Sequence, residues 1–178
     1  GRTGLQVSEI AFGAHGVDNQ ALMRAALEAG INTFCTSGSY LDGREERALN
    51  DALRSLRVPR DKVVIFTGDE VPVDMSSRQV VAAIDASLRR LGTDYIDVFY
   101  TAQVTSVDRV RAGGLLAGID EAKRAGSVRH LALSCHSGGM QDILNAAMDD
   151  ARFEVVFIKY DFVSYPDLDR VLRRASQK

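Results

Sequence analysis

Cysteine, long apolar runs and excess charge are all scarce in this sequence of 178 residues. Two cysteines, Cys35 and Cys135, are too few for a disulfide scaffold and indicate a reducing, cytoplasmic compartment. No run of about 18 apolar residues occurs, which predicts no transmembrane helix, and no signal peptide is visible. The net charge of -2 gives no indication of nucleic-acid or anionic-membrane binding. These absences favour an ordinary soluble globular protein.

The composition and length fit a single folded unit. Hydrophobic residues make up 46% of the chain and charged residues 26%. A chain of 178 residues is long enough for one domain with a sizeable core. Residues 1–178 are therefore predicted to form one domain.

Strand-like and helix-like segments alternate along the whole chain. Strands are predicted at residues 5–12, 31–36, 62–67, 95–101, 128–134 and 153–160. Helices are predicted at residues 18–29, 43–56, 76–91, 114–125, 140–148 and 166–175, with Asp18 as the first N-cap and a Ser76/Gln79 capping box. Six such units predict a parallel sheet with right-handed crossovers. The alternation does not separate a doubly wound sheet from a barrel, although no Gly-x-Gly-x-x-Gly follows the first strand.

Several separated stretches resemble one family. Residues 31–40 form an apolar strand that ends in small polar residues and then Tyr40, and they are similar to the second strand and loop of the aldo/keto reductases. Residues 1–13, 87–97 and 126–134 resemble the family's opening strand, an internal signature and the approach to its fifth strand. Residues 153–162 are similar to the subgroup that often carries an iron-sulfur appendage. The resemblance implies a (β/α)8 barrel, of which this chain holds about six units.

The resemblance also implies a reaction, the NADPH-dependent reduction of a carbonyl. In the family a tyrosine donates the proton, a lysine lowers its pKa, an aspartate supports the lysine and a histidine orients the carbonyl. Tyr40 matches the tyrosine, whereas Cys35, Gly68 and Ala102 stand at the aspartate, lysine and histidine positions. A phenol with a pKa of about 10 is a poor donor at neutral pH without such tuning. The family likeness therefore predicts a protein that has lost reductase activity.

The nicotinamide contacts depart from the family pattern as well. Ser134 is kept, but Cys135 replaces an asparagine on the fifth strand and Phe157 replaces a glutamine on the sixth. The family's phosphate-binding elements follow the sixth unit. We therefore expect no binding of NADPH or NADH, and NADPH is implied by the resemblance alone.

The remaining polar residues near the strand ends allow several interpretations. Tyr40 is expected to be a packed rim tyrosine, Cys35 an inert thiol and Lys159 a solvated strand end. The set His15, Cys35, Asp69, Cys135 and His136 matches no metal-binding spacing, and Asp69 with Glu70 is expected to lie in a loop.

Three functional classes stay open from the sequence. The chain is a non-reducing binding module, an oxidoreductase with a relocated site, or a structural subunit. The ligand or protein partner is unknown. An open six-unit sheet also predicts either a homodimer or a longer chain that completes the barrel.

Overall fold

The structure, a computed structural model, describes residues 2–136, 138–160 and 168–177. Six parallel strands pair in the order in which they occur in the sequence, β1-β2-β3-β4-β5-β6. The strands are β1 (Phe12–Gly13), β2 (Thr33–Cys35), β3 (Val64–Asp69), β4 (Ile96–Thr101), β5 (Val128–Cys135) and β6 (Phe153–Ile158). The helices are α1 (Gln20–Glu28), α2 (Arg44–Ser55), α3 (Ser77–Leu91), α4 (Val107–Val110), α5 (Gly113–Arg124), α6 (Met140–Asp149) and α7 (Leu168–Ser176), with short turns η1 (Tyr40–Gly43) and η2 (Arg60–Lys62).

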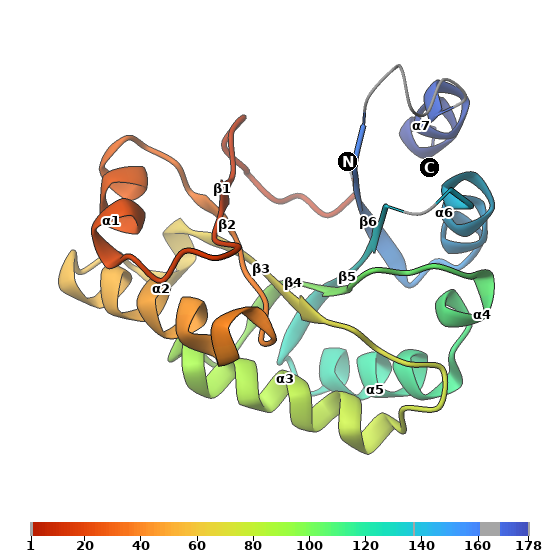
Figure 1. Cartoon of the computed structure of the whole chain (residues 1–178), viewed down its shortest axis with the longest axis horizontal. Coiled ribbons are helices and arrows are strands. Elements are labelled where there is room, and N and C mark those ends of the chain that lie inside the picture. Colours follow the sequence, from red (N-terminus) through yellow and green to blue (C-terminus); the bar gives the residue numbers. More distant parts are fainter. Residues whose placement is uncertain (1, 137, 161–167, 178) are drawn as a thin grey trace.

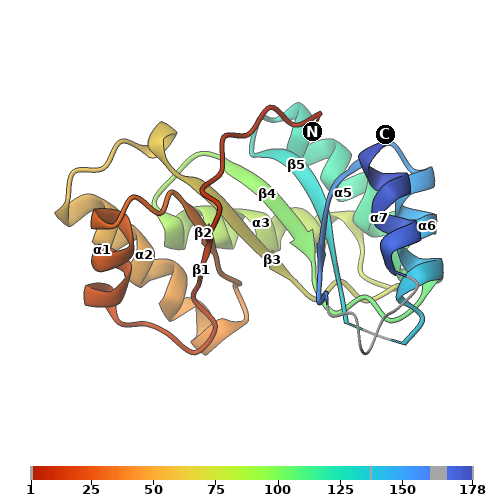
Figure 2. The ribbon, with the colours of Figure 1, turned by 90° about the horizontal axis from the view of Figure 1, so that it is seen from above.

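The sheet curls into a half-barrel with the helices on its convex side (Figures 1 and 2). The main core lies between the sheet and these helices, and it includes Phe34, Ile65, Phe99 and Leu131 from alternate strand positions. A second, smaller core lies on the concave side of the sheet. Side chains alternate between the two faces along each strand, which explains why the strands read as nearly continuous apolar runs.

The predicted β/α alternation is confirmed, with three local corrections. The first strand is only Phe12–Gly13 rather than residues 5–12, because residues 5–10 run along the end of the sheet without pairing. Asn19, not Asp18, caps α1, and its side-chain oxygen accepts the Ala21 N–H at 2.9 Å. Asp69 is the last residue of β3 rather than a loop residue. The prediction that a helix begins at position 166 lies outside the described residues.

Helix α3 shows why the helical predictions held. Ser76 and Gln79 form the predicted capping box, and Gly92 ends the helix with a left-handed φ of 63°. Val80, Ile84 and Leu91 recur at helical spacing and are buried. The helix is thus fixed at both ends by local chemistry and on one face by burial.

The N-terminal segment crosses the open side of the half-barrel. It runs from β1 toward the start of β6, as both views show (Figures 1 and 2). The guanidinium of Arg2 donates a hydrogen bond to the Phe153 carbonyl at 2.9 Å, and Leu5 packs against the concave-side core. Because these contacts join residues 151 positions apart, the segment links the two edges of the sheet.

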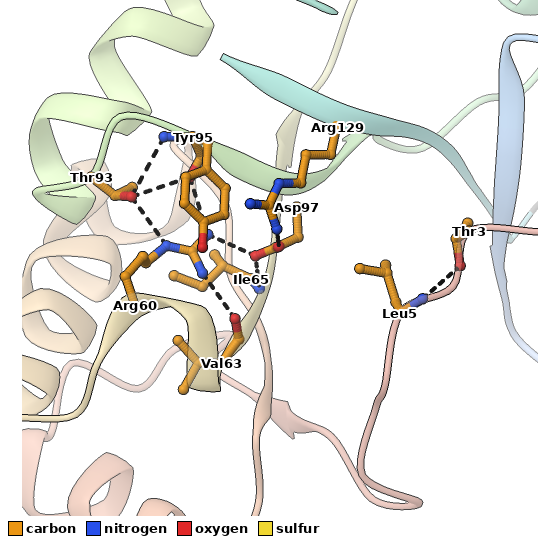
Figure 3. Close-up of polar contacts among 9 residues, drawn as sticks. All are labelled: Thr3, Leu5, Arg60, Val63, Ile65, Thr93, Tyr95, Asp97 and Arg129. Atoms are coloured by element: carbon orange, nitrogen blue, oxygen red, sulfur yellow. Dashed lines mark hydrogen bonds and ion pairs between the residues drawn. The ribbon is translucent and has the colours of Figure 1, made fainter. Parts of the chain in front are cut away.

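A charged cluster fixes the amino ends of β3, β4 and β5 (Figure 3). The Asp97 carboxylate is nearly buried and pairs with Arg60 at 2.6 Å and Arg129 at 3.1 Å. It also accepts the Ile65 N–H at 3.0 Å. Both guanidinium groups lie over the Tyr95 ring, at 4.1 Å and 3.7 Å from its centroid. One carboxylate and one aromatic ring thus tie three strands together at the end opposite to the candidate site.

Candidate functional site

The predicted site positions meet on the concave face, near the carboxyl ends of the strands. The concave-side core consists of Val98, Tyr100 and Ala132, with Leu5, Cys35, Phe66, Ala102 and Val155 packed against it. Cys35 ends β2 and Ala102 follows β4, so the fold brings together two of the positions named from the family resemblance. Carboxyl strand ends are where a barrel of this type carries its chemistry.

Cys35 lies half-buried in this core. Burial raises the pKa of its thiol to about 11, while the nearby Tyr100 hydroxyl opposes the increase and the Glu45 charge adds to it. At neutral pH Cys35 is therefore a protonated thiol, and the thiolate that a nucleophile or metal ligand requires is scarce.

Tyr40 begins the turn that follows β2. Its ring is half-buried and meets the exposed His15 ring edge-on, with 4.4 Å between the centroids. Tyr40 is therefore packed against the turn after β1, at the end of the sheet where β2 finishes.

Gly68 leaves no space for the side chain that the family carries at this position. It pairs with Tyr100 of β4 in the sheet. A Cβ placed on Gly68 would lie 1.9 Å from the Tyr100 carbonyl oxygen and 2.8 Å from its Cγ. Real Cβ atoms do not approach other atoms this closely, so β3 and β4 would have to separate before position 68 could hold even an alanine.

Tyr100 is the residue of this site that the sequence reasoning missed. Its side chain is 2% exposed, and its hydroxyl donates a hydrogen bond to the Thr36 carbonyl at 2.7 Å. Burial raises the pKa of this phenol far above its usual value, which keeps it neutral. The strict alternation of Val98, Tyr100 and Ala102 along β4 could have placed it on the concave face.

The three positions named for nicotinamide contact are divided between different environments. Ser134 and Phe157 are neighbours in the β5–β6 register, and Ser134 is nearly buried. Cys135 is fully buried in the helix-side core rather than on the concave face. Phe157 is 40% exposed and contacts the Tyr100 ring edge-on at 5.9 Å. Of the three, Ser134 alone offers a polar group suited to an amide.

A buried ion pair lies on the helix side of this end of the sheet. Glu46 is fully buried and accepts hydrogen bonds from the Thr67 hydroxyl at 2.6 Å and the Arg90 Nε at 2.5 Å. Arg90 also donates to the Ser87 hydroxyl at 3.1 Å. Glu46 has the helical spacing of the buried Leu49 and Leu53, so the pattern of α2 already indicated a buried carboxylate.

A second buried carboxylate, Glu45, lies under the turn after β1. Its Oε1 accepts the Gly16 N–H at 2.5 Å, whereas Oε2 has no hydrogen-bond partner among the described residues. Burial raises the pKa of Glu45, and the backbone N–H groups of Gly16 and Val17 oppose that increase.

Among residues 2–136, 138–160 and 168–177, no three His, Cys, Asp or Glu side chains are grouped so as to hold a metal ion. In the same ranges no helix has the length and apolarity needed to cross a membrane. A cavity of about 300 Å³ lies at the start of β6, lined by Arg2, Phe153, Glu154 and helix residues of α6 and α7. It lies apart from the positions that the family resemblance names.

The architecture agrees with a comparison against family models. The model of the aldo/keto reductase family matches residues 14–176. The chain belongs to the aldo/keto reductase family. Membership of the iron-sulfur subgroup stays a prediction.

Similar curated proteins are considerably longer than this chain. It is 30% identical over 149 residues to L-galactose dehydrogenase of Arabidopsis thaliana, a match that covers 75% of this chain and 46% of that protein. It is 35% identical over 114 residues to a probable voltage-gated potassium channel subunit beta of Oryza sativa subsp. japonica, covering 56% of this chain and 35% of that protein. The chain therefore spans about a third to a half of the curated relatives that it matches.

Solved aldo/keto reductases show the same fold. An aldo-keto reductase from Bacillus halodurans in its holo form superposes with a TM-score of 0.79 at 21% identity, covering 96% of this chain and 60% of that one. A thermostable aldo-keto reductase in complex with the inhibitor epalrestat gives a TM-score of 0.82 at 19% identity, covering 99% and 67%. The six β/α units thus correspond to part of the family's barrel.

Proposed function

We propose that this chain is an aldo/keto reductase-family protein that does not reduce carbonyls. The observation that carries the proposal is the backbone at Gly68, where a Cβ would lie 1.9 Å from the Tyr100 carbonyl oxygen. In the family a lysine at this position assists the tyrosine that donates the proton. Because the fold excludes any side chain at position 68, no lysine can reach Tyr40 from there, and a phenol with an ordinary pKa of about 10 is a poor proton donor without such help.

The other site positions support the same proposal. Cys35 is a neutral thiol and Ala102 offers only a methyl group, so neither can support a lysine or orient a carbonyl. The residues also do not fit the nicotinamide cofactor. Cys135 is buried in the helix-side core, and Phe157 has no hydrogen-bonding group for an amide. The proposal therefore includes no reaction step through NADPH.

A binding or structural role is the corresponding positive proposal. One similar protein is named as a subunit of a potassium channel, which associates the family fold with a role inside an assembly. The exposed Phe157 and the edge of β6, which pairs with no further strand among the described residues, could serve such a role. Light scattering after size exclusion measures whether the chain is a monomer or a homodimer.

The test of the negative proposal combines binding with turnover. The chain is titrated with NADPH while the nucleotide fluorescence is followed, and a panel of aldehydes and ketones is assayed, with the Bacillus halodurans reductase as the positive control. We expect no saturable binding and no turnover above the blank. Micromolar stoichiometric binding, or turnover that Tyr40→Phe abolishes, would show that the family's site has been rebuilt rather than lost.

A further inference from the structure

Strained backbone follows Tyr40. Leu41, Asp42 and Gly43 take left-handed φ values of 46°, 55° and 71° in succession. Glycine adopts this conformation readily, but a leucine in it is disfavoured, and a run of such residues persists only where the surroundings impose it. We name residues 36–43, which contain these three, the Tyr40 segment.

The beginning of the Tyr40 segment is anchored to the sheet. The buried Tyr100 hydroxyl donates to the Thr36 carbonyl at 2.7 Å. The Ser37 hydroxyl donates to the Gly68 carbonyl at 2.7 Å, and the Gly38 N–H donates to the same oxygen at 3.2 Å. The bonds of Ser37 and Gly38 join the segment to β3, the neighbour of β2, whereas the Tyr100 bond joins it to β4, one strand further away.

The end of the Tyr40 segment is anchored to helix α2. Arg47 donates to the Asp42 carbonyl at 2.8 Å, and the Arg44 Nε donates to the Leu41 carbonyl at 3.3 Å. Gly43 packs so closely on Arg90 that a Cβ there would lie 2.3 Å from Arg90 Cδ. The left-handed residues are therefore held directly by α2 and packed on Arg90 of α3, and the residues before them are held by the sheet.

We propose that Tyr100 is a positioning residue that holds the Tyr40 segment in a strained, closed conformation, and that the segment opens locally when either anchor is lost. Opening relieves the left-handed backbone and exposes the concave face beside Cys35. The inference does not depend on whether the chain binds a nicotinamide, because it concerns the protein's own hydrogen bonds.

The two cysteines provide an internal comparison for the test. Cys35 ends β2 directly before the Tyr40 segment, and its labelling by a thiol reagent reports local opening. Cys135 is fully buried in the helix-side core, and its labelling reports global unfolding. Labelling rates of both are measured by mass spectrometry of the intact chain under native conditions.

The variants carry opposite expected signs. Tyr100→Phe should speed Cys35 labelling about fivefold to tenfold, the ratio expected for the loss of one buried hydrogen bond, with a smaller change at Cys135. Arg47→Ala, at an exposed position, should speed it about twofold to fivefold through the other anchor. Leu41→Gly should slow it about twofold, because the strain is removed. The Tyr100 hydroxyl also lowers the pKa of the nearby Cys35 thiol, so its removal by itself slows labelling, and a faster rate reports opening.

Matched controls separate the proposal from a general loss of packing. Thr101→Val removes a buried hydroxyl from the same strand that has no hydrogen-bond partner among the described residues, and it should leave the Cys35 rate unchanged. Arg54→Ala makes the same change as Arg47→Ala at another exposed position of α2. Equal acceleration at both cysteines, an unchanged Cys35 rate in Tyr100→Phe and Arg47→Ala, or faster labelling in Leu41→Gly would each overturn the proposal.

Discussion

The two faces of the sheet differ in their charged side chains near the carboxyl ends of the strands. On the concave face, Cys35, Gly68, Tyr100 and Ala102 present no charge to the rim where the family carries out its chemistry. On the helix side, Glu46 is fully buried and paired with a cation. Charged side chains can serve a reaction or hold elements of the fold together. In this chain the Glu46–Arg90 pair does the second, and the concave-side residues named above carry no charge for the first.

Physical cost explains why the two kinds of charge have different fates. Removing one member of a buried ion pair leaves the other uncompensated, at a cost of about 3–5 kcal/mol. Cys35, Gly68 and Ala102 are uncharged, so the positions that we propose to be non-catalytic leave no charge uncompensated on the concave face. A fold does not depend on the residues of a reaction in the way that it depends on a buried ion pair.

The largest expected effect is at Gly68. Gly68→Ala should cost about 4 kcal/mol or more, or prevent folding, because its Cβ would lie 1.9 Å from the Tyr100 carbonyl oxygen. Gly13→Ala is the control, since a Cβ on this strand glycine meets nothing within 4 Å. Urea unfolding of both measures the difference. Equal stabilities would mean that β3 and β4 yield easily at position 68, and the main support for an excluded lysine would be lost.

The helix-side pair should come next. Glu46→Ala should cost about 3 kcal/mol, because it leaves Arg90 and the Thr67 hydroxyl without their buried acceptor. Arg90 is 22% exposed, so hydration limits the loss to the lower end of the range for buried pairs. Glu121→Ala, an exposed helical position, is the control in the same urea series. A loss below about 1 kcal/mol would show that the helix-side charges are no more needed than those missing from the concave face.

The Asp97 cluster at the amino ends of the strands tests whether buried ion pairs stabilise that end of the sheet as the Glu46–Arg90 pair is expected to stabilise the other. Asp97→Asn should cost about 2 kcal/mol, because the amide keeps the shape but leaves Arg60 and Arg129 without a counter-charge. Arg129 is 49% exposed and Arg60 20% exposed, so water replaces part of the lost interaction. Thermal unfolding of Asp97→Asn and of Asp94→Asn, an exposed neighbour, gives the comparison. A gain in stability for Asp97→Asn would contradict the view that this carboxylate ties the strands together.

Sequence reasoning found the fold because its signals are local and repeated. The capping box at Ser76, the terminating Gly92 and the apolar runs each predict an element without knowledge of the others. It failed at the first strand, where residues 5–10 have strand-like composition but pair with no strand. Pairing is a tertiary property that local propensity does not contain.

The site was predictable only in part, and for a related reason. The motif positions of Cys35 and Ala102 did meet in one core, as the resemblance required. The close contact at Gly68 could not be predicted from the sequence. A glycine in the sequence does not show how near the neighbouring strand lies, and here the Tyr100 carbonyl oxygen would be 1.9 Å from a Cβ on Gly68. Tyr100 and Glu46 were not predicted as site or core residues. The two-residue alternation along β4 places Tyr100 on the concave face, and the helical spacing of buried residues in α2 places Glu46 on its buried face.

The smallest effect, and the one that depends on pH, is expected at Glu45. Burial raises its pKa, so the folded state binds the proton more tightly than the unfolded chain, whose glutamate pKa is about 4.3. Its contribution to stability is therefore fully present below that value and is lost as the pH rises through the folded pKa. Glu45→Gln can still accept the Gly16 N–H and should be more stable than the wild type at pH 7, with the gain disappearing toward pH 4.

Glu154 provides the control of opposite sign for the same experiment. Burial raises the pKa of Glu154, but hydrogen bonds from Lys123 and His130 outweigh that effect and hold it below its usual value. Its stabilisation is present above the unfolded pKa and is lost as the pH falls through the folded pKa, so Glu154→Gln should be less stable than the wild type at pH 7. Urea unfolding of both variants from pH 4 to pH 8 should give curves that diverge in opposite directions with rising pH. If Glu45→Gln were destabilised by the same amount at every pH, its carboxylate would be a structural acceptor like Glu46, and the contrast between the two adjacent glutamates would not hold.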